Sequence, residues 1–177
     1  MKTDFSSVLI SESAIQQRVA EMAFRISEDY RGRSITAVGI LKGSFIFIAD
    51  LIRQLDPSIT VEVEFMTVSS YGGATVSSGR VRVEQDTQAS LQGKNVLLVE
   101  DIVDSGLTIS AIRDLLAARH PLSLRIATLL EKQTDPPHAV ALDYVGFQIP
   151  NVFVVGYGLD FAQRYRNLKE IRILNAG

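Results

Sequence analysis

The chain has 177 residues, of which 46% are hydrophobic and 21% are charged, and its formal net charge at pH 7 is −2. This is the composition of an ordinary globular domain, and its slightly acidic balance argues against a nucleic-acid-binding surface. The chain has no cysteine, which excludes disulfides and thiolate metal sites. We expect one domain over residues 1–177. No apolar segment approaches the roughly 18 residues of a membrane span and the amino terminus lacks a signal-peptide core, so we expect a cytoplasmic protein without membrane contact.

Near the amino terminus, the first helical pattern begins at Ser11 or Ser13, either of which can act as the N-cap. The pattern runs to about Tyr30 and has one apolar face, which predicts an amphipathic helix packed on the core. That face is formed by Ala14, Ile15, Val19, Met22, Ala23 and Ile26.

The next pair of elements is an apolar run at residues 35–41, typical of a buried strand, and a helical pattern at residues 45–55. The turn Lys42-Gly43-Ser44 lies between them. A basic, glycine-containing turn after a strand can bind an anion, although a lysine at a helix start is more often simply solvated.

A strand with one polar face is predicted at residues 60–68 because polar and apolar residues alternate there. Residues 69–79 follow; they are small, polar and glycine-rich, with one aromatic residue. This segment is either a long hairpin loop or a lid that closes over a substrate and excludes water. Val81 and Val83 resume the strand pattern.

The central stretch, residues 94–108, reads strand, acidic tip, small-residue turn and helix. Residues 96–99 form an unbroken apolar run, as expected for a strand buried on both faces. Glu100 and Asp101 follow this run directly, and a third acid, Asp104, follows after two apolar residues. Ligands of open α/β sheets bind beyond the carboxyl ends of the strands, so this tip is the strongest candidate for a functional site.

The turn after the acidic tip, formed by Asp104, Ser105, Gly106, Leu107 and Thr108, would aim backbone N–H groups at one point, at the positive end of a helix dipole. Such a turn favours an anion, whereas the acids repel one. A sugar phosphate with Mg²⁺ resolves the conflict, because carboxylates can bind both hydroxyls and the metal. The competing interpretations are a phosphoacceptor domain, or a plain strand–turn–helix corner with Asp104 or Ser105 as N-cap and the acids exposed.

The carboxyl-terminal part contains strand patterns at residues 123–130, 143–149 and 152–155, and a last apolar segment at residues 171–174. Lys132 and Asp160 each stand just beyond a predicted strand, where a site would lie. Taken alone, each residue also fits a non-functional role: Lys132 as a solvated charge, and Asp160 as part of a glycine-containing bend after a core strand. His138 lies in a proline-containing loop and is expected to be a surface residue rather than a metal ligand.

Four motifs along the chain together resemble motifs of the bacterial hypoxanthine–guanine phosphoribosyltransferases. VEDIVDSGLT (residues 99–108) is similar to the ribose-phosphate signature of phosphoribosyltransferases. LKG (41–43) resembles the pyrophosphate loop of the purine-specific members, in which the peptide bond before the basic residue is often cis. LEK (130–132) and VGFQIPNVFVVGYGLDFAQRYR (145–166) favour the purine-specific members over orotate and pyrimidine ones.

The resemblance, which covers about residues 41–174, implies an α/β fold with a mostly parallel sheet flanked by helices, a small hood and a flexible lid loop. It also implies transfer of the 5-phosphoribosyl group from 5-phosphoribosyl 1-diphosphate to a 6-oxopurine, with Mg²⁺ as the cofactor. Ser70 and Tyr71 resemble the start of the family's lid.

For the diphosphate substrate, the resemblance assigns hydroxyl binding to Glu100 and Asp101, 5′-phosphate binding to residues 105–108, and pyrophosphate binding to the LKG loop and Arg166. The full set of implied contacts is Lys42, Gly43, Glu100, Asp101, Asp104, Ser105, Gly106, Leu107, Thr108 and Arg166. Glu100, Asp101 and Asp160 are the implied metal ligands, with Asp160 reaching a second Mg²⁺ directly or through water.

For the base, the resemblance implies that Lys132 donates to the 6-oxo group, Phe153 stacks on the ring and Val154 offers backbone groups to the purine edge, with Asp160 nearby. Asp104 is the implied catalytic residue, accepting the N7 proton or holding N7 by a hydrogen bond. A lysine facing C6 would disfavour adenine, whose amino group is a donor.

Two alternatives remain at this point. One is a xanthine-preferring phosphoribosyltransferase, since contacts at C2 decide that preference. The other is a regulator that keeps the fold but binds RNA, which a basic surface would favour and the acidic balance disfavours. We expect small-molecule substrates, no nucleic-acid partner, and a homodimer or homotetramer, the assemblies that the family forms.

Overall fold

The computed structural model describes residues 5–70 and 81–174, which form an α/β fold with two sheets. In the six-stranded sheet all neighbouring strands are parallel except β3 and β4. Its strand order is β4 (Val81–Gln85), β3 (Thr60–Ser70), β2 (Ser34–Leu41), β5 (Asn95–Val103), β6 (Ser123–Lys132) and β7 (Tyr144–Ile149). The small antiparallel sheet is the predicted hood, with the order β1 (Phe5–Ile10), β9 (Ile171–Leu174) and β8 (Val154–Val155).

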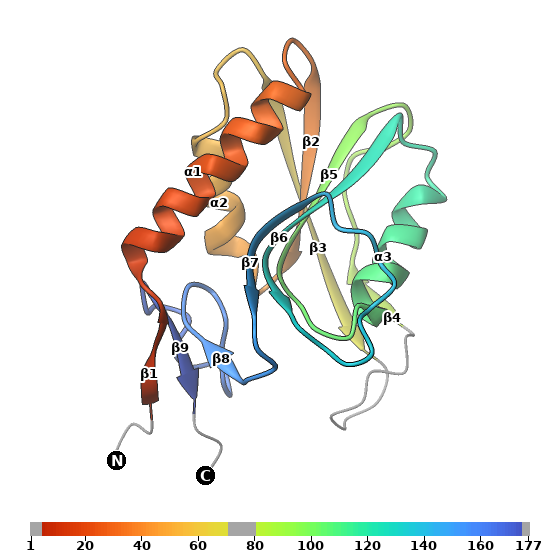
Figure 1. The fold of residues 1–177 in the computed structure, drawn as a ribbon. Helices are drawn as coiled ribbons and strands as arrows, with labels where there is room; N and C mark the ends of the chain where they lie inside the picture. The colour runs from red at the N-terminus through yellow and green to blue at the C-terminus, as the bar shows by residue number, and fades with distance from the viewer. Residues whose placement is uncertain (1–4, 71–80, 175–177) are drawn as a thin grey trace.

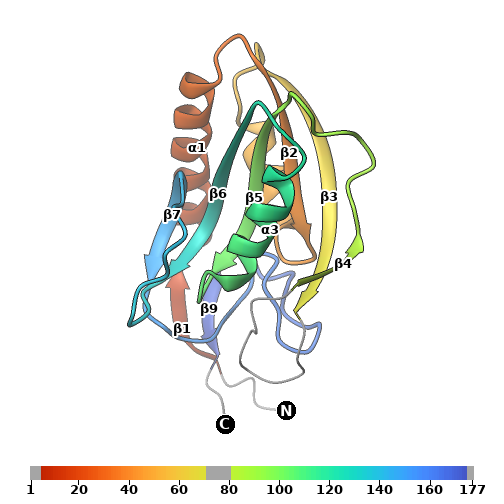
Figure 2. The same cartoon turned by 90° about the vertical axis from the view of Figure 1, so that its right-hand side faces the viewer.

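Helices cover both faces of the large sheet. Helices α1 (Glu12–Asp29) and α2 (Phe45–Arg53) lie on one face, and α3 (Leu107–Ala117) lies on the other (Figures 1 and 2). Alternate residues of one strand enter two separate cores: Leu97 packs in the cluster that contains α1 and α2, whereas Leu98 packs in the cluster that contains α3. Burial on both faces is the reason that the central strands read as unbroken apolar runs.

Most predicted elements are confirmed, with small differences at their ends. Ser11 is the N-cap of α1, and its hydroxyl accepts a hydrogen bond from the Ala14 backbone N–H at 3.3 Å. The main difference is β5, which continues to Val103 instead of ending at residue 99. Pairing with β6 continues through this extension, so Glu100 and Asp101 belong to a central strand rather than to a tip beyond it.

The parallel strands β2, β5 and β6 end at one edge of the sheet, so their carboxyl ends bring Lys42, Asp104 and Lys132 to the same region. The hood lies at this end of the sheet, and both termini of the described chain run from it (Figure 1). Among the described residues, no helix is long and apolar enough to cross a membrane. Ser70 ends β3, while Tyr71 and the rest of the predicted lid lie outside the described residues.

Candidate active site

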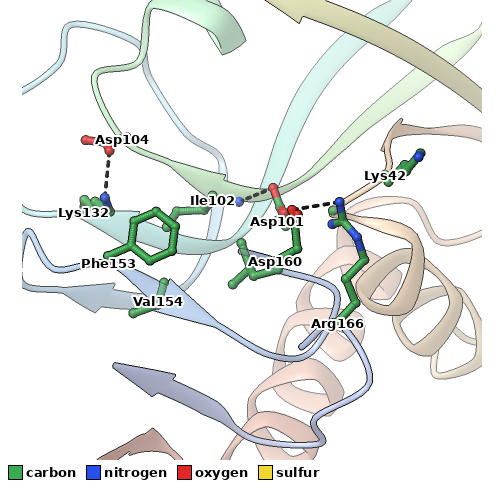
Figure 3. Close-up of a pocket in the computed structure, with 11 residues that line it drawn as sticks. Lys42, Asp101, Ile102, Asp104, Lys132, Phe153, Val154, Asp160 and Arg166 are labelled. Carbon is green, nitrogen blue, oxygen red and sulfur yellow. Dashed lines mark hydrogen bonds and ion pairs between the residues drawn. The ribbon is translucent and has the colours of Figure 1, made fainter. Parts of the chain in front are cut away.

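Two adjoining pockets lie at the carboxyl edge of the sheet. The larger has a volume of about 390 Å³ and the smaller of about 180 Å³, and Ile102 and Asp104 line both. The larger pocket is lined by Lys42, Gly43, Asp101, Ile102, Asp104, Lys132, Phe153, Val154, Leu159, Asp160 and Arg166 (Figure 3). The smaller is lined by Glu100, Ile102, Val103, Asp104, Ser105, Gly106, Thr108 and Ile109.

The smaller pocket contains the predicted anion turn. Gly106 is the N-cap of α3, has a φ of +75° and makes no side-chain capping bond, so the suggestion of Asp104 or Ser105 as N-cap was wrong. A Cβ at Gly106 would lie 2.6 Å from the Cβ of His138, which leaves room only for glycine. The turn thus presents the uncapped start of a helix, which favours an anion. Leu107 is 45% exposed and lines neither pocket.

Glu100 and Asp101 form a buried carboxylate pair, each only 9% exposed, so the alternative of exposed acids is excluded. Burial raises the pKa of Glu100 well above its usual value, and the neighbouring Asp101 charge adds to the shift. Burial also raises the pKa of Asp101, although hydrogen bonds with Glu100 and the backbone, and then the positive charge of Arg166, oppose the rise. Two adjacent buried carboxylates are costly unless cations or hydroxyl donors reach them.

Close backbone packing holds the Asp101 carboxylate in place. A Cβ at Gly43 would fall 1.7 Å from Asp101 Oδ2, so the turn after β2 can lie there only because residue 43 is glycine. Gly158, with a φ of +101°, packs on the other side of this turn, where a Cβ would lie 2.2 Å from the Gly43 carbonyl oxygen. The Leu41–Lys42 peptide bond is cis in this turn.

An ion pair lies at one end of the larger pocket, close to Lys42 (Figure 3). Arg166 Nη2 lies 2.7 Å from Asp160 Oδ1, and Arg166 Nη1 donates to the Gly158 carbonyl oxygen at 2.6 Å. Asp160 Oδ2 also accepts from the Gln163 backbone N–H at 2.8 Å. These bonds orient a guanidinium toward the pocket, at the end where Lys42 supplies a second positive charge.

A second ion pair lies at the opposite end, where Lys132 Nζ and Asp104 Oδ2 are 2.8 Å apart (Figure 3). The Lys132 side chain is 12% exposed, while that of Asp104 is 54% exposed. Phe153 is half-exposed and packs edge-to-face on Phe161, with ring centroids 5.8 Å apart. This end of the pocket offers one cation, one anion and an exposed aromatic ring, which suits a flat, polar heterocycle.

Five residues near the site were missed by the sequence analysis. Ile102 and Leu159 line the larger pocket, Val103 and Ile109 line the smaller one, and Phe161 packs on Phe153. A signal was available for each, because Ile102 and Val103 directly follow the predicted acid Asp101, Ile109 directly follows Thr108, and the other two flank Asp160.

Two predictions about side chains need correction or qualification. His138 was expected at the surface, but its side chain is 7% exposed, because the loop after β6 folds against Gly106. Its Nε2 lies 3.1 Å from Glu131 Oε1. The three predicted metal ligands divide between two pockets, and within residues 5–70 and 81–174 no group of three or more histidine, cysteine or acidic side chains could hold a metal ion.

Comparison with known proteins gives a consistent result. Residues 9–162 match the phosphoribosyl transferase domain model. The hypoxanthine-guanine phosphoribosyltransferase of Bacillus subtilis is 46% identical over 98% of this chain and 96% of its own length. A bifunctional protein TilS/HprT of Listeria innocua is 47% identical over 98% of this chain, which spans 26% of that longer protein. The structure of a Staphylococcus aureus hypoxanthine phosphoribosyltransferase superposes with a TM-score of 0.91 at 43% identity, over 97% of this chain and 92% of the other.

Proposed function

The chain belongs to the phosphoribosyltransferase family, and from its similarity to hypoxanthine–guanine members we infer that it is a hypoxanthine–guanine phosphoribosyltransferase of purine salvage. It transfers the 5-phosphoribosyl group of 5-phosphoribosyl 1-diphosphate to the base, forming IMP or GMP and releasing pyrophosphate. One observation carries the inference: an anion turn, a buried carboxylate pair, a cationic end and a base-sized end adjoin along one sheet edge. The base-sized end and the cationic end lie at opposite ends of the larger pocket, which suits an incoming base and a departing pyrophosphate on opposite sides of the sugar.

The sugar phosphate and the leaving group occupy sites of opposite charge. The 5′-phosphate binds the uncapped start of α3, where Ser105 and Thr108 add hydroxyl donors. The ribose hydroxyls donate to Glu100 and Asp101, which satisfies the buried carboxylates. Departing pyrophosphate is held by Lys42 and Arg166, whose charges offset the negative charge that develops on it.

The carboxylates of Asp101 and Asp160 fit Mg²⁺, since they are oxygen donors that line the same pocket as the pyrophosphate-binding cations. Because no group of three or more such side chains occurs in the described chain, the remaining oxygen ligands come from the substrate and water. Bound Mg²⁺ would neutralise charge on pyrophosphate and template the sugar. Burial raises the pKa of Glu100 and Asp101, and a bound cation would oppose that rise.

The base binds at the Lys132–Asp104 end. In a 6-oxopurine the 6-oxo oxygen and N7 lie on the same edge, so the ammonium and the carboxylate, 2.8 Å apart, can contact both. Lys132 donates to the oxygen, and Asp104 accepts the N7 proton as N9 attacks the sugar. Phe153 stacks on the ring, and Val154 offers its backbone groups to the opposite edge.

The first experiment offers hypoxanthine, guanine, xanthine, adenine and uracil separately, with phosphoribosyl diphosphate and Mg²⁺. Turnover of hypoxanthine and guanine, with adenine and uracil inert, is the expected result. Activity on xanthine would extend the substrate range without changing the mechanism. Turnover of adenine or uracil instead would overturn the roles of Lys132 and Phe153. No turnover with any base would favour the alternative function, an RNA-binding regulator with the same fold.

Lys132→Ala sharpens this test. The variant should lose most activity on 6-oxopurines and discriminate less between hypoxanthine and adenine, since the donor facing C6 is gone. Unchanged selectivity would remove Lys132 from base recognition. Lys94→Ala is the matched control, because Lys94 pairs with Glu62 at the other end of the sheet.

The remaining family properties extend the proposal. We expect a cytoplasmic enzyme that assembles as a homodimer or homotetramer. Light scattering of the purified chain measures the assembly, and a monomer at working concentrations would contradict it.

A further inference from the structure

Tyr157 lies outside the pockets but between the two segments that supply their cationic end. It follows β8 in the sequence Gly156-Tyr157-Gly158, and all three residues have positive φ, with +51° at the tyrosine. Positive φ is costly for an aromatic residue and persists where the surroundings enforce it.

The Tyr157 side chain is 6% exposed, and its hydroxyl donates to Asp50 Oδ2 at 2.7 Å. Burial and then the bond to Asp50 raise the pKa of Tyr157, so the hydroxyl stays protonated and acts as the donor at neutral pH. The Tyr157 backbone N–H donates to the Leu168 carbonyl oxygen at 2.8 Å. Side chain and backbone thus join Tyr157 to two different parts of the chain.

The two joined parts carry the predicted pyrophosphate contacts. Asp50 is on α2, which starts directly after the Lys42-Gly43-Ser44 turn. Gly158, next to Tyr157, packs on the Gly43 carbonyl oxygen and accepts from Arg166 at 2.6 Å. The Tyr157–Asp50 bond therefore spans the same two walls that Lys42 and Arg166 contribute to the larger pocket.

We propose that Tyr157 is a positioning residue for pyrophosphate: through Asp50 it fixes the separation of the Lys42 turn and the Arg166 segment. This inference rests on the function proposed above. The base-binding end is set by β5, β6 and Phe153, so the Tyr157–Asp50 bond affects the diphosphate and leaves the base contacts unchanged.

A matched control lies at the other end of the sheet. Tyr144 is 2% exposed, and its hydroxyl donates to Asp29 Oδ2 at 2.6 Å. Tyr144→Phe therefore removes the same kind of tyrosine–aspartate bond from a site that supports no pocket residue. A purely structural effect of losing such a bond would appear in both variants.

The test compares Tyr157→Phe and Tyr144→Phe with the wild-type chain. Tyr157→Phe should raise the KM for phosphoribosyl diphosphate about three- to tenfold, as expected for a lost hydrogen bond to a partly exposed charge, while the KM for hypoxanthine stays unchanged. Tyr144→Phe should change neither KM. Asp50→Asn keeps a hydrogen-bond acceptor and should give a smaller increase than Tyr157→Phe.

The inference is overturned if the KM for the diphosphate stays within about twofold in Tyr157→Phe, or if Tyr144→Phe raises it equally. A parallel rise in the KM for hypoxanthine would also count against it, because that would indicate a general loosening. Calorimetric affinity for pyrophosphate with Mg²⁺ tests the inference without turnover. If the wild-type chain were inactive on every base, the proposed function would fail, and this affinity, expected to be weakened in Tyr157→Phe alone, would decide the inference by itself.

Discussion

The two ends of the large sheet differ in how their charged side chains are partnered. At the amino ends of the parallel strands, acids face cations: Glu62 pairs with Lys94, Asp86 with Arg119 and Asp29 with Arg125. At the carboxyl ends, Glu100 and Asp101 lie buried next to each other, as described above, and Phe153 is left half-exposed.

The difference indicates a division of labour between the ends. The pairs at the amino ends are satisfied within the chain, so they can contribute to stability without any ligand. The carboxylates at the carboxyl ends accept hydrogen bonds from the Asp101 and Ile102 backbone N–H groups. Hydroxyls or a cation would add the remaining partners that these buried charges require, so their burial favours the ligand-bound state over the free one. Substitutions at the carboxyl ends should therefore change activity, and substitutions at the amino ends should change stability.

The largest expected effect is that of Asp104→Asn on turnover. Loss of the carboxylate that accepts the N7 proton should lower kcat with hypoxanthine by about 10²–10⁴-fold, with little change in the melting temperature, because the side chain is 54% exposed. Steady-state kinetics and thermal unfolding measure the two quantities. Asp86→Asn is the control at the amino ends and should show normal kcat; full turnover by Asp104→Asn would remove its role as general base.

Gly43→Ala should have the next largest effect. The added methyl group would fall 1.7 Å from Asp101 Oδ2, so the carboxylate or the turn must move. A displacement of about 1 Å in a reacting site costs on the order of 10²-fold in rate, and we expect a fall of that size in kcat/KM for the diphosphate. Gly32→Asn serves as control, because no atom lies within 4 Å of the added Cβ and asparagine tolerates the φ of +69°. Near-normal kcat/KM in Gly43→Ala would contradict the close packing.

At the amino ends, Arg125→Met should lower stability without affecting activity. Arg125 Nη1 lies 2.5 Å from Asp29 Oδ2 and donates to the Tyr144 hydroxyl at 2.6 Å. Because the Arg125 side chain is 39% exposed, the ion pair itself contributes little, and we expect a loss of about 1 kcal/mol in the free energy of unfolding. Urea unfolding and a kcat within about twofold of wild type would support the division; a large loss of kcat would contradict it.

The sequence predicted the helices, the strands of the large sheet and most pocket residues, because unbroken apolar runs followed by acids or lysines are local features. It did not predict β1 and β9 of the hood as strands. It placed the end of β5 too early, since the pairing of Glu100 and Ile102 with β6 is a contact between distant segments. It also misplaced His138, whose burial depends on how the loop after β6 folds against Gly106. The role of Gly43 beside Asp101 could not be derived from spacing alone, because the two residues are 58 positions apart in the sequence and only the fold brings them into contact.

The last expected effect is a small change in stability, and it tests the comparison by its sign. Burial raises the pKa of Glu100 above the usual 4.5, so the protonated acid is favoured in the folded chain. Its contribution to stability is present below the pKa of the unfolded chain and is lost as the pH rises through the folded pKa. Glu100→Gln keeps an oxygen to accept from the Asp101 backbone N–H, as Oε1 does at 3.1 Å, and should stabilise the ligand-free protein at neutral pH by about 1 kcal/mol.

Glu62→Gln should show the opposite pH dependence. The hydrogen bond and charge of Lys94 lower the pKa of Glu62, so its contribution is present above the unfolded pKa and is lost as the pH falls through the folded pKa. At neutral pH we expect Glu100→Gln to raise the melting temperature and abolish most activity, and Glu62→Gln to lower the melting temperature slightly while remaining active. Thermal unfolding at pH values below and above the usual glutamate pKa of 4.5 measures both. If the melting temperature shifted in the same direction in both variants, the buried acids at the carboxyl ends would not destabilise the ligand-free protein. The pair would then have enough hydrogen-bond partners without a ligand.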